Sequence, residues 1–204
     1  MMKQSSKTAR KMGRPRSFDE KAVLDAAMRL FWERGYEGTS MTDLTKAMKL
    51  SPPSIYAAFG DKMALFQAAA KRYAEGPGQY QAKALRERTL KEVIQGLFRN
   101  TVEFLNDSRY PSGCMTLTGA MACSVEDQAA KDFLAEIRRQ NEAALRARLQ
   151  QARKSGELPT DVNLDDYARY LSTLLGGLAI QAANGISRAE MKRIGDMAVR
   201  HLGY

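Results

Sequence analysis

Apolar residues recur along most of this chain at the three- and four-residue spacing of an α-helix, and the two-residue alternation of a half-buried strand is scarce. Helix-start signals agree with this pattern, because a Ser or Thr followed three residues later by Asp or Glu can cap a first helical turn. Five such pairs occur: Ser17 with Glu20, Ser40 with Asp43, Thr89 with Glu92, Ser124 with Asp127, and Ser187 with Glu190. The pattern predicts an all-α protein.

The N-terminal part of the pattern predicts one long helix followed by two short ones. The long helix is expected over residues 18–34, with an apolar face made of Phe18, Ala22, Val23, Ala26, Ala27, Leu30 and Phe31. A short helix over residues 41–48 is expected to turn Leu44, Ala47 and Met48 inward. Ser51 then caps a second short helix, since Pro52 suits the first helical position. Another helix restarts at Asp61.

Gly76, Pro77 and Gly78 form a strong helix breaker, which predicts a boundary between two domains. The first domain would span residues 17–75 and the larger second domain residues 76–204. Helices in the second domain are expected at about 79–87, 89–106, 114–123, 125–154, 164–184 and 187–202.

Composition narrows the class of protein. The 204 residues are 44% hydrophobic, which is enough for a sizeable buried core. No apolar run reaches the roughly 18 residues that a membrane span needs. The basic N-terminus lacks the apolar segment of a signal peptide. The chain is therefore expected to stay in the cytoplasm and to have no membrane partner.

The net charge of +9 is unevenly distributed. Residues 1–16 carry six basic and no acidic side chains, whereas residues 17–75 carry eight of each. A basic arm of this composition cannot bury itself. It is either a solubilising tail or a flexible arm that becomes ordered on a polyanion such as nucleic acid.

The sequence offers little material for catalysis or for a cofactor. It has one His and two Cys, and it lacks a phosphate-binding loop, a dinucleotide fingerprint, a zinc-protease motif and a G-x-S-x-G elbow. Cys114 and Cys123 would lie on opposite faces of the expected helix 114–123, where they cannot share a metal or form a disulfide. We expect no enzyme activity, no metal site and no cofactor.

Two short helices joined by a few residues and braced by longer ones are typical of a helix-turn-helix DNA-binding module, although a ligand-free helical bundle has the same spacing. From Gly13 to Phe66 the order and spacing of several segments resemble the tetracycline-repressor-like (TetR) family of transcriptional regulators. The segments are Gly13-Arg14-Pro15-Arg16, Ala26-Ala27, Leu30-Phe31, Gly35-Tyr36, Thr39-Ser40-Met41, Ser51-Pro52-Pro53-Ser54-Ile55-Tyr56, Phe59-Gly60-Asp61-Lys62 and Leu65-Phe66. The resemblance implies an N-terminal three-helix DNA-binding domain joined to a larger helical domain for ligand binding and dimerisation.

The resemblance also implies roles for individual residues. Arg14 and Arg16 would lie in or beside the minor groove. The start of the second helix would bond phosphates through Thr39, Ser40 and Thr42. The recognition helix would hold Ser51, Pro52, Pro53, Ser54, Tyr56 and Ala57. Tyr56 and Lys62 match the phosphate-contacting tyrosine and lysine of the family.

Two departures from the family pattern affect this interpretation. Lys49 stands where the family usually has a glycine, so the turn either adopts a positive φ with some strain or takes another form. Pro52 and Pro53 cannot donate hydrogen bonds to bases, which leaves direct readout to Ser54, Tyr56 and Ala57. We therefore expect specificity to depend on DNA shape and on the basic arm.

Beyond residue 76 the resemblance lies in architecture, and it implies an effector cavity and a homodimer interface. Helices 164–184 and 187–202 are the expected interface, with Met191, Ile194, Met197 and Leu202 as one stripe, although an intramolecular core would explain the stripe equally well. Aromatic residues and adaptable methionines with few polar groups suit an apolar or aromatic effector. The candidate lining residues are Phe98, Thr101, Phe104, Leu105, Met115, Thr118, Met121, Ile137, Asn141 and Tyr170.

Two hypotheses remain at this point. The first is a homodimeric regulator of transcription, expected to be a repressor, that a small-molecule effector releases from a palindromic operator. The second is a nonspecific DNA-binding or helical interaction protein without an effector switch.

Overall fold

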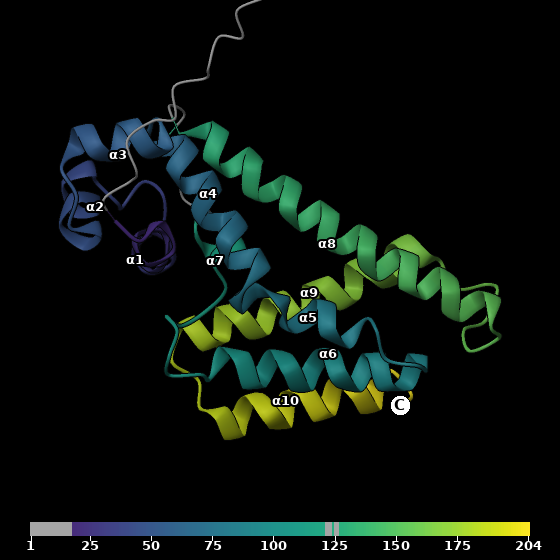
Figure 1. Ribbon diagram of the computed structural model, residues 1–204. Coiled ribbons are helices and arrows are strands. Elements are labelled where there is room, and N and C mark those ends of the chain that lie inside the picture. Colours follow the sequence, from purple (N-terminus) through teal and green to yellow (C-terminus); the bar gives the residue numbers. More distant parts are fainter. Residues whose placement is uncertain (1–17, 121–123, 125–126) are drawn as a thin grey trace, which may run out of the picture.

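The computed structural model describes residues 18–120, 124 and 127–204, and every regular element in these residues is helical. The N-terminal elements are α1 (Glu20–Arg34), α2 (Met41–Met48), α3 (Pro52–Phe59) and α4 (Lys62–Glu75). Figure 1 shows α1, α2 and α3 grouped at one end of the molecule, with α4 leading away from them. The all-α prediction is confirmed.

The N-terminal helices enclose an aromatic core. The Phe66 ring packs edge-on against the rings of Phe31 and Tyr36, with both centroid distances at 5.0 Å. Gly35 ends α1 with a φ of 71°, a conformation that glycine adopts without a steric penalty. This turn lets the chain fold back so that α2 packs against α1.

Three details of the predicted N-terminal faces are wrong. The first helix begins at Glu20, because Asp19 caps it by accepting from the Lys21 and Ala22 N–H groups, so Phe18 lies before the helix. Ala22 and Ala47 are exposed. In α2, Leu44 and Met48 lie four residues apart and are the buried residues of the inner face, which leaves Ala47 outside. Ser17 lies outside the described residues.

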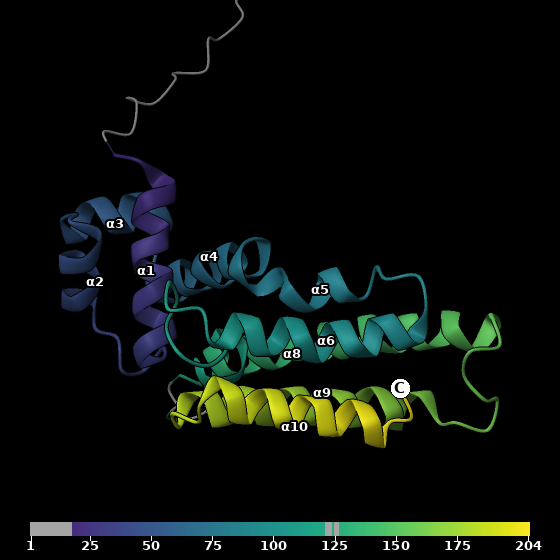
Figure 2. The same cartoon turned by 90° about the horizontal axis from the view of Figure 1, so that it is seen from below.

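The following elements are a short 3-10 helix η1 (Pro77–Gln79) and six α-helices. These are α5 (Tyr80–Ala84), α6 (Leu90–Leu105), α7 (Met115–Thr118), α8 (Gln128–Lys154), α9 (Leu164–Ala183) and α10 (Arg188–His201). The two views together show α6 and α10 side by side with their axes nearly aligned, and α8 inclined to them (Figure 1 and Figure 2). The central α6 packs against α5, α9 and α10, while α8 packs against α9. This arrangement leaves α5, α7, α8 and α9 around one hollow region, described below.

Helix starts follow the sequence signals in three places and depart from them in a fourth. The capping boxes of Ser40 with Asp43, Thr89 with Glu92, and Ser187 with Glu190 are all present. The predicted start at residue 125 lies outside the described residues, and α8 as described begins at Gln128 without a side-chain cap. The Asp127 N–H donates to the Ser124 carbonyl and so forms a turn ahead of the helix.

The predicted helices 79–87 and 114–123 are both too long. After Ala84 the Arg86 N–H bonds the Lys83 carbonyl, which closes a turn instead of extending α5. The α7 helix has four residues and ends at Thr118, and the carbonyl of the following Gly119 accepts the Tyr36 N–H at 2.7 Å. The single-helix argument about the two cysteines therefore does not hold. Cys114 is buried, and Cys123 lies outside the described residues.

In the described part of the chain, no helix is both long enough and apolar enough to cross a bilayer.

Candidate nucleic-acid interface and effector cavity

Local hydrogen bonds fix the start of both short helices. Ser40 accepts the Asp43 N–H at 3.1 Å, and the Asp43 carboxylate accepts the Ser40 N–H in return. These bonds hold the pKa of Asp43 below its ordinary value, because they favour the ionised carboxylate. Ser51 caps α3, and its hydroxyl lies 2.9 Å from that of Ser54. Each short helix is therefore positioned by residues within its own first turn.

Lys49 makes the turn between α2 and α3 in the left-handed region, with φ 54° and ψ 38°. Its N–H donates to the Thr45 carbonyl and so closes the end of α2. Of the two forms expected for this turn, the structure has the one with a positive φ at Lys49. A lysine here carries a steric cost that glycine would not have, because its Cβ approaches the following carbonyl.

The outer face of α3 is exposed and uncharged. Ile55 is fully buried and fixes the rotation of the helix against the core. This rotation turns Pro53, Tyr56 and Ala57 toward solvent, and the Tyr56 side chain is 50% exposed. Ser51 and Pro52 are exposed as well, while Ser54 is half-buried. The helix thus offers hydroxyl, phenol and methyl groups to a partner, and no charge.

The residues at the start of α2 divide into two groups. Ser40 and Thr42 are exposed. Thr39 is fully buried, and its hydroxyl donates to the Gly35 carbonyl at 2.7 Å. The structure therefore places the Thr39 side chain inside the loop, away from the surface that Ser40 and Thr42 share.

Lys62 begins α4 directly after the Asp61 cap. Its ammonium lies 4.2 Å from the centroid of the Tyr36 ring, which is a cation–π contact. This contact holds a positive charge next to α3. Arg14 and Arg16, the predicted minor-groove residues, lie outside the described residues.

The larger domain contains a cavity of about 840 Å³ between α4, α5, α8, α9 and the segment that includes α7. Its apolar walls include Leu85, Leu97, Leu117, Leu145 and Leu175. Cavities of this size accommodate drug-sized molecules, whose affinity comes largely from apolar contact.

A cluster of hydroxyl groups and one thiol forms part of the cavity wall. The Cys114 Sγ lies 3.3 Å from the Tyr73 hydroxyl and 3.2 Å from the Thr116 hydroxyl, and Tyr80 donates to it at 3.8 Å. Burial raises the pKa of the Tyr73 and Tyr80 phenols well above their ordinary value, so both are neutral. The wall therefore presents neutral polar groups beside apolar ones.

Two of the predicted effector contacts, Ile137 and Asn141, line this cavity. Tyr170 is 49% exposed on the outside of α9 and is not among the lining residues. Other predicted contacts are not among the lining residues: Phe98, Thr101, Leu105 and Met115, which are buried, and Phe104 and Thr118, which are half-buried. Phe104 stacks on Tyr80 at 4.2 Å and thus supports the wall from behind. Met121 lies outside the described residues.

Sequence reasoning missed the polar lining residues Tyr73, Tyr80, Cys114, Thr116 and Arg138. For Arg138 a signal existed, because it lies three residues before Asn141, on the same side of a helix. Tyr73 and Tyr80 lie on the two sides of the break at Gly76, and Cys114 and Thr116 come from a segment at least 34 residues further along the chain, so no local pattern joins them.

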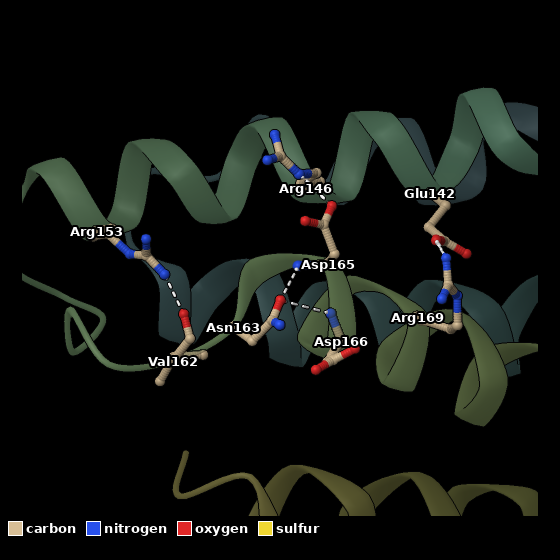
Figure 3. A network of polar contacts seen from close by, with 8 residues as sticks. All are labelled: Glu142, Arg146, Arg153, Val162, Asn163, Asp165, Asp166 and Arg169. Carbon is tan, nitrogen blue, oxygen red and sulfur yellow. Dashed lines mark hydrogen bonds and ion pairs between the residues drawn. The ribbon is translucent and has the colours of Figure 1, made fainter.

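Ion pairs join α8 to α9 along one side of the cavity (Figure 3). Arg146 pairs with Asp165, and Arg169 donates to Glu142 at 3.0 Å. At the end of the same row, Arg153 donates to the Val162 carbonyl, and Asn163 caps α9. These contacts hold the two helices in register at the cavity rim.

Several contacts join α1 and the loop after it to the segment before α8. The Tyr36 N–H donates to the Gly119 carbonyl, and the Trp32 indole donates to the Gly113 carbonyl at 3.3 Å. A Cβ added to Gly35 would lie 3.2 Å from the Gly119 oxygen, so the two backbones meet closely. The α7 segment therefore touches both the cavity and the N-terminal helices.

A helix-turn-helix pair with an exposed second helix, carried on a helical domain with a cavity, defines the architecture of a two-domain transcriptional regulator. Two family models match the chain. Residues 23–69 match bacterial regulatory proteins of the tetR family, and residues 91–194 match the tetracyclin repressor-like C-terminal domain. The chain belongs to the TetR family of DNA-binding transcriptional regulators, which are not enzymes.

Relatives cover nearly the whole chain. The HTH-type transcriptional repressor ComR of Escherichia coli (strain K12) is 29% identical over 190 residues, which are 92% of this chain and 90% of ComR. The uncharacterized HTH-type regulator YezE of Bacillus subtilis (strain 168) is 32% identical over 163 residues, 79% of this chain and 84% of YezE.

A solved structure is similar over a comparable length. A cysteine mutant of the TetR family regulator CifR, complexed with 26-base-pair operator DNA, has a TM-score of 0.88 and 34% identity. The match covers 92% of this chain and 98% of CifR.

Proposed function

We propose that the protein is a homodimeric repressor that a small-molecule effector releases from a palindromic operator. The observation that supports this most is the contact of α7 with both the cavity wall and the loop before α2. An effector that prefers one arrangement of the larger domain would change the relative position of the two recognition helices. Operator affinity can then fall by no more than the effector's preference between the two arrangements, and the operator weakens effector binding by the same factor as the effector weakens operator binding.

The DNA contacts we assign follow from exposure and chemistry. The exposed face of α3 would enter the major groove, where Ser51, Pro52, Pro53, Ser54 and Ala57 approach base edges. Phosphates would be bound by Ser40, Thr42, Tyr56 and Lys62. Thr39 would support the loop, since its hydroxyl is already bonded to Gly35.

We further propose that Arg14 and Arg16 contribute specificity from the minor groove. Since α3 carries no charge and begins with two prolines, its direct readout is limited. Deletion of residues 1–16 should therefore weaken operator binding more than binding to random DNA. An equal loss for both DNAs would contradict the role of the arm in specificity.

Dimerisation is proposed through α9 and α10. Tyr170, Ile180, Ile194 and Met197 are large apolar residues left exposed on these two helices, at 41–50% exposure. Met191, by contrast, is buried within the protomer. Two copies of this face would form a four-helix interface and space the recognition helices about 34 Å apart, one turn of DNA.

The proposed organisation assigns residues 1–16 to the arm, 17–75 to the DNA-binding domain and 76–204 to effector binding and dimerisation. The effector would have an apolar or aromatic body, in keeping with the leucine-rich walls of the cavity. A regulator of chromosomal operators acts in the cytoplasm, which is the location we propose.

Selection of bound sequences from random duplex DNA, at about 0.15 M salt, tests the proposal. An enriched palindrome would support specific dimeric regulation and provide a probe for effectors. Binding without enrichment that disappears as the salt concentration rises would contradict it, and would favour a nonspecific DNA-binding protein.

A further inference from the structure

Three arginines line the cavity, and one of them has no carboxylate partner among the described residues. Arg139 lies 2.7 Å from Glu136, and Arg169 lies 3.0 Å from Glu142. Arg138 has no carboxylate within ion-pair distance among the residues that the structure describes. Its Nη1 donates to the Thr116 backbone carbonyl at 2.6 Å, and this is its one hydrogen bond within the described chain.

The surroundings make this uncompensated charge unfavourable. Burial lowers the pKa of Arg138 from its ordinary value, an effect that Cys114 partly offsets and Arg139 reinforces. A guanidinium has five N–H donors, and one bond to a carbonyl leaves most of them free for another acceptor. Glu142, one helical turn further along α8, is engaged by Arg169 instead.

Two other arginines of α8 also bond backbone carbonyls, and they serve as a comparison because their role is structural. Arg148 donates to the carbonyls of Glu87 and Arg88, and Arg153 donates to that of Val162. Both close loops, and neither lines the cavity. Arg138 differs because it lines a space large enough for a ligand.

We propose that the effector is an amphipathic organic oxyanion, such as an aromatic or aliphatic carboxylate or sulfonate, whose anionic group is bound by Arg138. This inference rests on the proposed function of the cavity. The apolar body of the ligand would lie against Leu85, Leu97 and Leu175, while the guanidinium fork matches the planar geometry of a carboxylate.

The same arginine gives the ligand a route to the DNA-binding domain. Arg138 is bonded to Thr116 in α7, and Gly119 at the end of α7 is bonded to Tyr36. An anion that repositions the guanidinium therefore acts on the segment that touches the loop before α2.

A pair of matched dyes tests the inference on the full chain. The anion 8-anilinonaphthalene-1-sulfonate and the neutral N-phenyl-1-naphthylamine share an aromatic body and differ in the sulfonate. We expect the anionic dye to bind saturably, once per protomer. Arg138→Gln should weaken its binding by tenfold or more, on the order expected for a lost charge-assisted hydrogen bond, and leave the neutral dye unchanged.

Arg146→Gln is the matched control, because it removes the same charge from α8 outside the cavity, and both dyes should bind it as they bind wild type. If Arg138→Gln does not fold, the test is the ratio of the affinities of the two dyes for the wild-type protein. A preference for the neutral dye overturns the inference. Equal loss of the anionic dye in both variants also overturns it. Saturable binding of the neutral dye alone overturns the anion preference and leaves the effector cavity intact. Binding of neither dye overturns both.

Discussion

The short helices α2 and α3 are fixed by polar contacts that are local in the sequence, whereas the cavity domain adds contacts between distant segments to its own capping boxes. In the first region, Thr39 bonds a carbonyl four residues away, and the Ser40 capping box spans three residues. In the second, Arg138 reaches a carbonyl 22 residues away, and the Leu90 N–H reaches Glu157 across 67 residues.

The surface of α2 and α3 is therefore determined by nearby residues, whereas the interior of the cavity domain can change when a ligand binds. The caps of α2 and α3 form with the helices themselves and do not depend on the rest of the molecule. The cavity exists only when α4, α5, α8 and α9 are assembled, so a ligand can alter their packing without reshaping α3. The DNA-binding surface then changes its position and keeps its shape.

The largest expected effect comes from removing a long-range contact in the cavity domain. Arg148 is buried and donates at 3.2 Å to the carbonyls of Glu87 and Arg88. Arg148→Met should lower the free energy of unfolding by about 2–3 kcal/mol, because it removes two charged hydrogen bonds made by a buried guanidinium. Urea unfolding measures this loss.

Arg146→Met is the control on the same helix, since Arg146 forms an exposed ion pair worth about 1 kcal/mol or less. Equal destabilisation by the two variants would mean that long-range bonds do not hold this domain.

A smaller effect, on DNA binding, is expected from Lys62. Lys62→Met should weaken operator binding about tenfold per dimer and reduce the salt slope by about 2, because each protomer loses one phosphate contact. The melting temperature should change little. Lys71→Met is the control, since Lys71 lies on the exposed side of α4 and pairs with Glu75. A salt slope unchanged by Lys62→Met would exclude the assigned contact.

The capping box of α2 should contribute less again. Ser40→Ala should cost about 1 kcal/mol and lower the melting temperature by roughly 2–4 °C, because it removes an N-cap. The Ser40 bonds hold the pKa of Asp43 below 3.8, so their contribution is present above that value and is lost as the pH falls through the lower folded pKa. The difference between wild type and Ser40→Ala should therefore shrink in acid. A difference that grows in acid would contradict this sign.

The smallest effect is expected at the turn. Lys49→Gly should stabilise the protein by at most about 1 kcal/mol, since glycine relieves the left-handed conformation but has more freedom when unfolded. Lys46→Gly removes the same charge inside α2 and should destabilise by about 1 kcal/mol. The melting temperature should therefore rise for Lys49→Gly and fall for Lys46→Gly. A lower melting temperature for Lys49→Gly would show that the turn is not strained.

The two regions also differ in how far the sequence predicts them. The helix pair, its caps and the exposed face of α3 follow from signals within a few residues. The inward side chain of Thr39 does not, because a buried hydroxyl bonded to Gly35 looks identical in sequence to an exposed one. Of the residues that line the cavity, the sequence predicts only Ile137 and Asn141, because the other walls come from segments far apart in the chain. The end of α7 is also not predictable from nearby residues, because the Gly119 carbonyl accepts a hydrogen bond from the distant Tyr36 N–H.

Trp32 makes the proposed boundary at Gly76 a poor place to exchange domains. Its ring lies on α1 and packs edge-on against Tyr73 of the same proposed domain at 4.7 Å, yet it also stacks with Phe104 and Tyr110, beyond Gly76, at 5.7 Å each. A chimera that joined this DNA-binding domain to another regulator's effector domain would have to recreate the partners of this indole or leave it in water. An exchange of domains among relatives should therefore succeed only where the incoming effector domain has aromatic residues at the positions of Phe104 and Tyr110.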